Sequence, residues 1–129
     1  MGASAALPRA EPKVHEASAA EALVKMVSAE AQARNAARVS RILLVVGEST
    51  GYMRESLEFY FAASAKGGLA EGALLDIRYV KPLVRCPSCG LEFERKRFTF
   101  DCPVCGEQGI MTSIGGEFYV DSIEIEESA

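Results

Sequence analysis

The sequence predicts an α+β fold, with a three-stranded mixed sheet, two helices and an inserted four-cysteine module. Two observations indicate this fold. The spacing of apolar residues changes along the chain and predicts, in order, a helix, a strand, a second helix and two further strands. The four cysteines stand as two pairs between the last two strands. A chain of 129 residues is long enough for one core and a small module with its own means of stabilisation.

The first half of the chain predicts two helices and the strand between them. Ala17–Arg38 is rich in residues that favour helices, and its apolar residues recur at helical spacing. Val39–Gly47 is mostly apolar and β-branched and ends at a glycine, which predicts a buried strand. Met53–Lys66 carries apolar and aromatic residues along one stripe and ends at a pair of glycines, which predicts the second helix.

Two further strands are predicted from alternating apolar and polar residues. In Ala73–Val80, Leu75 and Ile77 alternate with Asp76, which indicates one solvated face. Glu117–Glu124 alternates in the same way. Because a helix connects the first two strands, we expect them to be parallel or nearly adjacent in one sheet, which the two helices cover.

Composition limits the classes of protein that the chain can belong to. A hydrophobic fraction of 49% and a charged fraction of 25% are typical of folded globular domains. The net charge of -4 has the wrong sign for a protein whose main partner is nucleic acid. No window approaches the roughly 20 apolar residues of a membrane span, so we expect no contact with nucleic acid or membrane.

The sequence lacks the motifs of several common catalytic sites. His15 is the single histidine, so a catalytic triad could form only around a residue near the start of the chain. The glycine-rich loops that bind phosphate are also missing, and we predict that the protein is not an enzyme. Without an export signal we expect a cytoplasmic setting, where cysteines more often bind metal than form disulfides.

The cysteines form two similar motifs, Cys86-Pro87-Ser88-Cys89-Gly90 and Cys102-Pro103-Val104-Cys105-Gly106. Two residues between cysteines allow a tight turn to direct both sulfurs at one ion, and the glycine lets the backbone fold back. Four thiolates suit tetrahedral zinc, although iron uses the same ligands and an oxidising setting would allow disulfides. We therefore predict an inserted four-cysteine zinc ribbon. A closed site of this kind stabilises the fold and does not catalyse.

The histidine stands beside a glutamate at the start of the first predicted helix. A lone histidine is usually a surface or capping residue. His15 and Glu16 nevertheless follow Val14 at the start of the first helix, and an imidazole next to backbone nitrogens at a chain start suits square-planar Ni(II) or Cu(II).

Taken together in chain order, these features resemble the HypA/HybF family of hydrogenase maturation factors over about Val14–Glu127. The family begins with Met-His-Glu leading into a helix, and its members then carry an apolar strand ending in glycine, a helix, a second strand, the two cysteine motifs and a closing strand. The corresponding segments here are His15–Ser18, Ile42–Gly47, Glu55–Phe61, Gly72–Ile77, Cys86–Gly106 and Gly116–Ile125.

The resemblance implies a nickel metallochaperone. It implies that His15 is the primary ligand of the transported Ni²⁺, that Glu16 is a supporting residue or ligand, and that Cys86, Cys89, Cys102 and Cys105 hold structural Zn²⁺. The implied partners are a HypB-type GTPase and the large subunit of a [NiFe]-hydrogenase, with urease accessory proteins in some bacteria. We expect a monomer or a weak homodimer.

The sequence is also expected to divide into domains. Residues 1–13 are expected to be a disordered extension, residues 14–83 and 113–129 a nickel-binding α/β domain, and residues 84–112 a zinc-ribbon domain. In the family the histidine is the second residue. Since Val14 occupies the position of the family's initiator methionine, we expect the physiological protein to begin at residue 14 through a valine-type start codon.

Two other functions compete with this interpretation. One is a zinc-ribbon nucleic-acid or transcription accessory module that binds through basic and aromatic residues, namely Arg95–Arg97, Phe93, Phe98 and Phe100. The other is a rubredoxin-like electron carrier, which would be coloured by iron.

Overall fold

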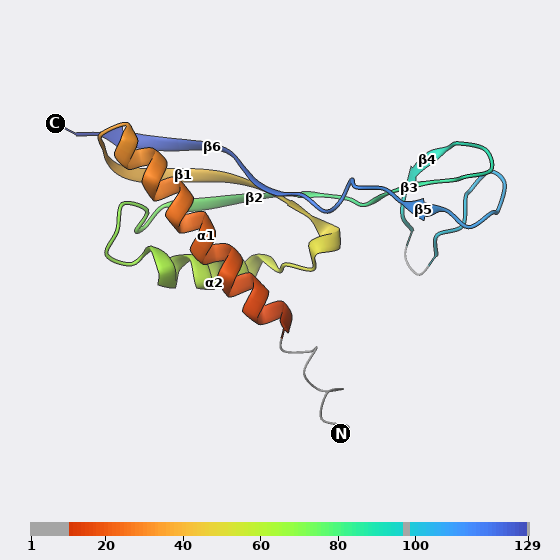
Figure 1. Cartoon of the computed structure of the whole chain (residues 1–129), viewed down its shortest axis with the longest axis horizontal. Helices are drawn as coiled ribbons and strands as arrows, with labels where there is room; N and C mark the ends of the chain where they lie inside the picture. The colour runs from red at the N-terminus through yellow and green to blue at the C-terminus, as the bar shows by residue number, and fades with distance from the viewer. Residues whose placement is uncertain (1–10, 97–98, 129) are drawn as a thin grey trace, which may run out of the picture. The chain divides into compact units, whose positions relative to one another are not determined.

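The computed structural model describes residues 11–96 and 99–128, with side chains from His15 onward (Figure 1). The chain forms two compact units. The first contains the described residues up to Leu44, Tyr52–Ile77 and the chain from Val120. The second contains Val45–Gly51 and Arg78–Tyr119, and therefore all four cysteines. The domain ranges expected from the sequence stay a prediction.

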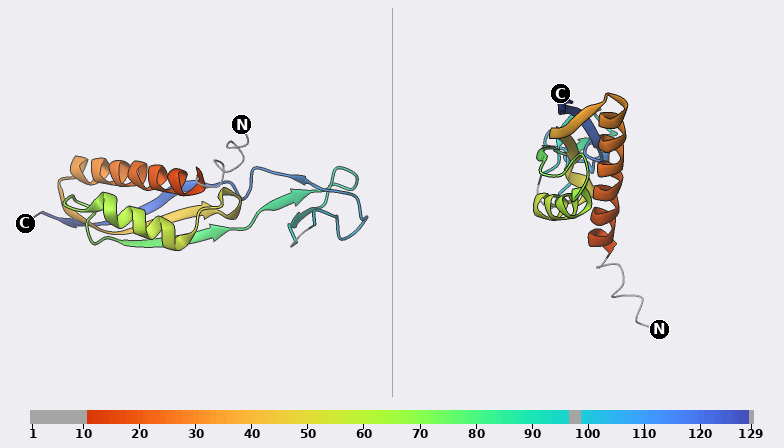
Figure 2. Two further views of the ribbon diagram at one scale, coloured as in Figure 1. Left: turned by 90° about the horizontal axis from the view of Figure 1, so that it is seen from below. Right: turned by 90° about the vertical axis from the view of Figure 1, so that its left-hand side faces the viewer.

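The first unit contains a three-stranded sheet with the order β2-β1-β6. Its strands are β1 (Ala36–Gly47), β2 (Leu74–Val80) and β6 (Phe118–Glu127). Strands β1 and β2 run in the same direction and β6 runs in the opposite one, as Figure 2 shows. The sheet is mixed, and the prediction of two adjacent parallel strands is confirmed.

Two helices cover one face of this sheet and pack against each other (Figure 2). They are α1 (Glu11–Ala33) and α2 (Arg54–Ala65). Their buried side chains and those of the sheet form one apolar core: Ala20, Leu23, Val27 and Ala31 of α1, Leu57, Phe61 and Ala65 of α2, and Val39, Ile42, Leu44, Leu75 and Ile77 of the sheet. Each fully buried aliphatic side chain stabilises the fold by about 1.5–3 kcal/mol.

The other face of the sheet is polar. The Arg41 guanidinium forms ion pairs with Asp76 of β2 and with Glu124 of β6, at 3.5 Å in the second case, so one cation on β1 links all three strands. Exposed ion pairs of this kind contribute up to about 1 kcal/mol each. The solvated face predicted around Asp76 is the one observed.

The first helix begins and ends earlier than the sequence predicted. The expected range was Ala17–Arg38, whereas α1 runs from Glu11 to Ala33 and β1 begins already at Ala36. Asn35 ends the helix with a φ of 56°, and its N–H donates to the carbonyl of Gln32 at 3.0 Å. Asparagine tolerates this left-handed conformation, and it therefore ends the helix here. Helix propensity alone did not indicate this end.

The second unit is built around a smaller sheet with the order β4-β3-β5. Its strands are β3 (Leu83–Arg85), β4 (Glu92–Glu94) and β5 (Ile110–Met111), and both outer strands pair antiparallel to β3. A short 3₁₀ helix, η3 (Glu48–Thr50), belongs to the same unit. Among the helices of residues 11–96 and 99–128, none is long and apolar enough to cross a membrane.

A close backbone approach lies at the end of β1. The Gly47 N–H donates to the carbonyl of Glu117 at 2.7 Å, and the Ser49 N–H donates to that of Gly115 at 2.8 Å. A Cβ added to Gly47 would lie 1.9 Å from the carbonyl oxygen of Gly115. Since this neighbour is backbone, only glycine fits at residue 47.

We predict that Gly47→Ala lowers the free energy of unfolding by about 2 kcal/mol or more, because the backbone must move to admit the methyl group. Gly68→Ala is the matched control, since its nearest neighbour would be the Ala65 carbonyl oxygen at 3.6 Å. The control should change stability by less than about 0.5 kcal/mol. Denaturant titration compares the two variants, and equal effects would contradict the prediction.

Candidate metal centres

The two cysteine motifs adopt the same local structure. The first begins directly after β3, where the Cys86 N–H donates to the Leu91 carbonyl and the Gly90 N–H donates to the Cys86 carbonyl, both at 2.8 Å. In the second, Cys102 and Gly106 make the equivalent bonds at 2.8 and 2.9 Å. Both glycines have a φ of 79°. The glycine at the end of each motif is therefore required by the turn.

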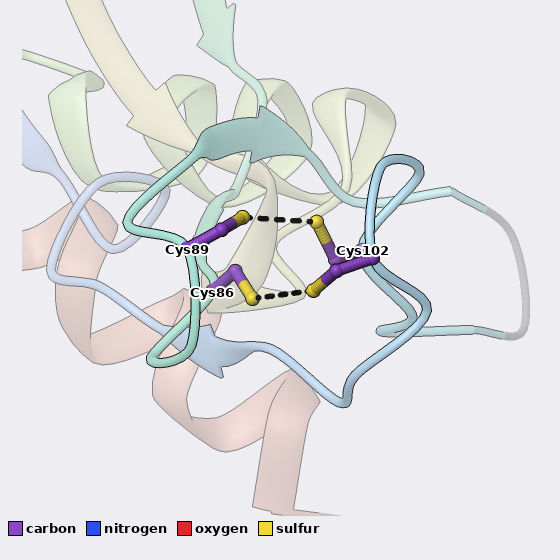
Figure 3. A group of neighbouring side chains, drawn as sticks. Cys86, Cys89 and Cys102 are labelled. Carbon is purple, nitrogen blue, oxygen red and sulfur yellow. Dashed lines mark hydrogen bonds between the residues drawn. The ribbon is translucent and has the colours of Figure 1, made fainter.

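The four sulfurs converge on one point. All four lie within 4.8 Å of one another. The Cys86 and Cys105 sulfurs are 3.4 Å apart and those of Cys89 and Cys102 are 3.7 Å apart (Figure 3). These distances exceed the roughly 2.05 Å of a disulfide bond and are close to the ~3.8 Å sulfur spacing of a tetrahedron with Zn–S near 2.3 Å. The donor set and its spacing fit one tetrahedral metal ion.

The first cysteine of each motif is buried and the second is exposed. Cys86 and Cys102 are buried, whereas Cys89 and Cys105 face solvent. Beside Cys86 lies Val84, which is also fully buried. The N–H of Cys89 lowers the pKa of the Cys86 thiol to about 7, against the opposing effect of burial. This sulfur is thereby prepared as a thiolate ligand.

The second cysteine of each motif holds its proton more strongly. The Glu107 N–H favours the thiolate of Cys105, but the Cys86 sulfur and desolvation outweigh it and raise the pKa of Cys105 to about 12. The pKa of Cys89 is raised as well: the Leu91 N–H favours its thiolate, but desolvation and the Cys102 and Cys86 sulfurs outweigh this effect. A bound cation must displace these protons, so metal binding is coupled to proton release and strengthens as the pH rises.

The other predicted ligands lie in the first unit, on α1. The His15 side chain is exposed, whereas Glu16 is buried, with 3% of its surface exposed. One carboxylate oxygen of Glu16 accepts a hydrogen bond from the Met53 N–H at 2.6 Å. Met53 was not predicted as part of this region, because its backbone N–H leaves no signal in the sequence. Among the described residues, the cysteines are the one group of three or more metal-binding side chains found together.

The basic and aromatic residues of the competing nucleic-acid interpretation are described only in part. The Arg95 guanidinium lies over the Phe100 ring, 4.4 Å from its centre. This stacking holds the arginine against its own module. Arg97 and Phe98 lie outside the described residues.

Comparison with known proteins gives consistent matches. The family model described as hydrogenase/urease nickel incorporation, metallochaperone, hypA matches residues 14–125. The hydrogenase maturation factor HypA of Caldanaerobacter subterraneus subsp. tengcongensis is 44% identical over 114 residues, which cover 88% of this chain and all of the relative. That of Chlorobium limicola is 42% identical, and the match covers 88% of this chain and 98% of the relative.

Two solved structures share the fold. The solution structure of the Ni metallochaperone HypA from Helicobacter pylori matches with a TM-score of 0.61 and 22% identity, over 88% of this chain and 98% of that one. Another solution structure of HypA protein matches with a TM-score of 0.66 and 22% identity, over 89% and 98%.

We predict that the purified chain contains about one zinc ion and that Cys86→Ser removes it. Loss of a direct thiolate ligand should weaken zinc binding by more than about 100-fold, since changes in the second shell already weaken it 10- to 100-fold. Ser88→Ala, between the first two cysteines, is the matched control and should retain the metal. Metal analysis and competition with a chelating dye measure the effect. A Cys86→Ser protein with full zinc content would contradict the proposed ligand set.

Proposed function

Because the chain belongs to the HypA family of metallochaperones for nickel incorporation into hydrogenase and urease, we propose that it binds Ni(II) at His15 and delivers the ion to a [NiFe]-hydrogenase. The resemblance inferred from the sequence is confirmed, and the protein is a maturation factor and not an enzyme. Because the chain belongs to this family, the nucleic-acid and electron-carrier interpretations are set aside.

The chemistry of His15 supports this nickel site. It is the single histidine of the chain, and its exposed side chain is accessible to an ion and to a receiving protein. Imidazole is a suitable ligand for nickel, and backbone nitrogens complete the square-planar geometry that Ni(II) adopts with nitrogen ligands. Glu16, the next residue, is either a second ligand or a supporting residue. A cargo ion must leave again, which an exposed and incomplete protein site favours.

The four-cysteine site serves a different purpose in this proposal. Four thiolates leave no open coordination position on a tetrahedral ion, so the bound zinc neither exchanges readily nor catalyses. It stabilises a unit with few buried apolar residues. Four thiolates at this spacing suit a tetrahedral zinc ion, and zinc is favoured over iron because a maturation factor does not need the redox chemistry that iron would supply. The four free thiols suit the reducing cytoplasm, which is the compartment we propose.

Delivery needs partners that supply what the chain lacks. The sequence has no phosphate-binding loop, so any nucleotide hydrolysis must come from another protein, and we propose a HypB-type GTPase. The proposed recipient is the large subunit of the hydrogenase, and urease accessory proteins are a second route in hosts that make urease.

We predict that His15→Ala abolishes specific nickel binding and leaves the fold intact. The side chain is exposed and contributes nothing to the core, so the thermal midpoint should shift by less than about 2 °C. Glu21→Ala, an exposed residue on the same helix, is the matched control and should bind nickel like the unmodified chain. Titration calorimetry measures both. Unchanged nickel affinity in the His15 variant would overturn the proposed site, since the sequence contains no second histidine.

We also predict that a chain starting at residue 14 with methionine binds nickel at least about tenfold more tightly than the full chain. Starting at residue 14 supplies a free amine next to His15, whose pKa of about 7.7–8.0 allows deprotonation near neutral pH. Equal affinities of the two chains would show that the preceding residues do not matter.

A further inference from the structure

Among the described residues, Glu16 is the one charged residue that is buried. Only 3% of its surface is exposed. It stands four residues before Ala20, and together with Leu23 and Val27 it lies on the stripe of α1 that packs toward α2. It is also the first buried side chain of α1 among those described. A carboxylate in this place requires a partner, since an unpaired buried charge strongly destabilises a fold.

The partner is the backbone at the start of α2. The Met53 N–H donates to a Glu16 carboxylate oxygen at 2.6 Å, a short bond of the charge-assisted kind. Met53 is the N-cap residue of α2, and its own side chain forms no capping hydrogen bond. In a capping box, a glutamate at the third helical position accepts the N–H of the N-cap residue. Here a glutamate from a different helix makes this bond, and its negative charge lies at the positive end of α2.

The side chains of His15 and Glu16 point in different directions. Consecutive residues of an α-helix point about 100° apart, and side chains at i and i+1 do not face each other. His15 is accordingly exposed while Glu16 is buried. One ion cannot contact both side chains while this part of α1 is helical. Nickel binding by Glu16 would require its carboxylate to leave Met53 and the first turns of α1 to unwind.

We propose that Glu16 is a positioning residue that fastens the start of α2 to α1 beside His15, and that it does not ligate nickel. Its bond to Met53 holds the segment of α1 that carries the imidazole. Without this bond that segment frays, and nickel binding must then order it again, which weakens the affinity. This inference rests on the proposed function, in which His15 is the nickel ligand.

The test compares Glu16→Ala, Glu16→Gln and the exposed control Glu21→Gln in the full zinc-loaded chain. Without nickel, Glu16→Ala should lower the thermal midpoint by about 5–10 °C, since it removes a bond to a charged group. It should also speed hydrogen exchange of the Met53 amide at least about tenfold. The glutamine oxygen still accepts the Met53 N–H but carries no charge, so Glu16→Gln should recover most of both losses.

Titration with nickel chloride then separates positioning from ligation. Glu16→Ala should weaken nickel binding by about 5- to 10-fold, and Glu16→Gln should restore it to within about twofold, because the glutamine oxygen keeps the bond that holds this segment of α1. If Glu16→Gln kept the stability but bound nickel as weakly as Glu16→Ala, the carboxylate would be a ligand and the proposal would be wrong.

Two further outcomes would also overturn it. Unchanged Met53 exchange in Glu16→Ala would show that the bond does not hold α2. Lower stability with unchanged nickel affinity would show that it does not position the nickel site. Failure of the proposed function would be distinguishable, because nickel binding would then be unchanged in His15→Ala. The measurements without nickel would still show whether Glu16 holds the start of α2.

Discussion

Burial of the central strand β1 is the constraint on which the rest of the first unit depends. It is hydrogen-bonded to both β2 and β6, and its residues Val39, Ile42 and Leu44 are fully buried. Because both edge strands pair with it, β1 fixes their register. It ends at Gly47, where the close approach of Gly115 leaves no room for a side chain.

The two proposed metals relate to stability in opposite ways. In the unit that holds the cysteines the strands of the small sheet have two or three residues, and the largest fully buried side chains among its described residues are Val46, Val84 and Cys86. A unit of this size buries little apolar surface, so the proposed zinc site would take the place of a larger core. The proposed nickel site adds to a helix that is already packed, and its ligand His15 is exposed. An ion bound there can leave without unfolding the protein.

The sequence by itself determined the elements whose signal is local. Helix α2 and the strand β2 follow from hydrophobic spacing, together with the pair of glycines after the helix, and they lie within one residue of the predicted ranges. The repeated cysteine motif predicted the metal cluster, because two residues between cysteines already direct both sulfurs to one side of a turn. The order of these elements was sufficient to indicate the family.

The tertiary structure alone decided what depends on residues far apart in the chain. Helical spacing places Glu16 on the stripe of Ala20 and Leu23, but nothing near it in the sequence supplies the partner that a buried carboxylate needs, since Met53 lies 37 residues later and contributes only a backbone N–H. The requirement for glycine at residue 47 likewise comes from Gly115, across the fold. Local spacing therefore identified His15 and Glu16 as a pair, but only packing of α1 against α2 exposes one and buries the other, because adjacent helical side chains point in different directions.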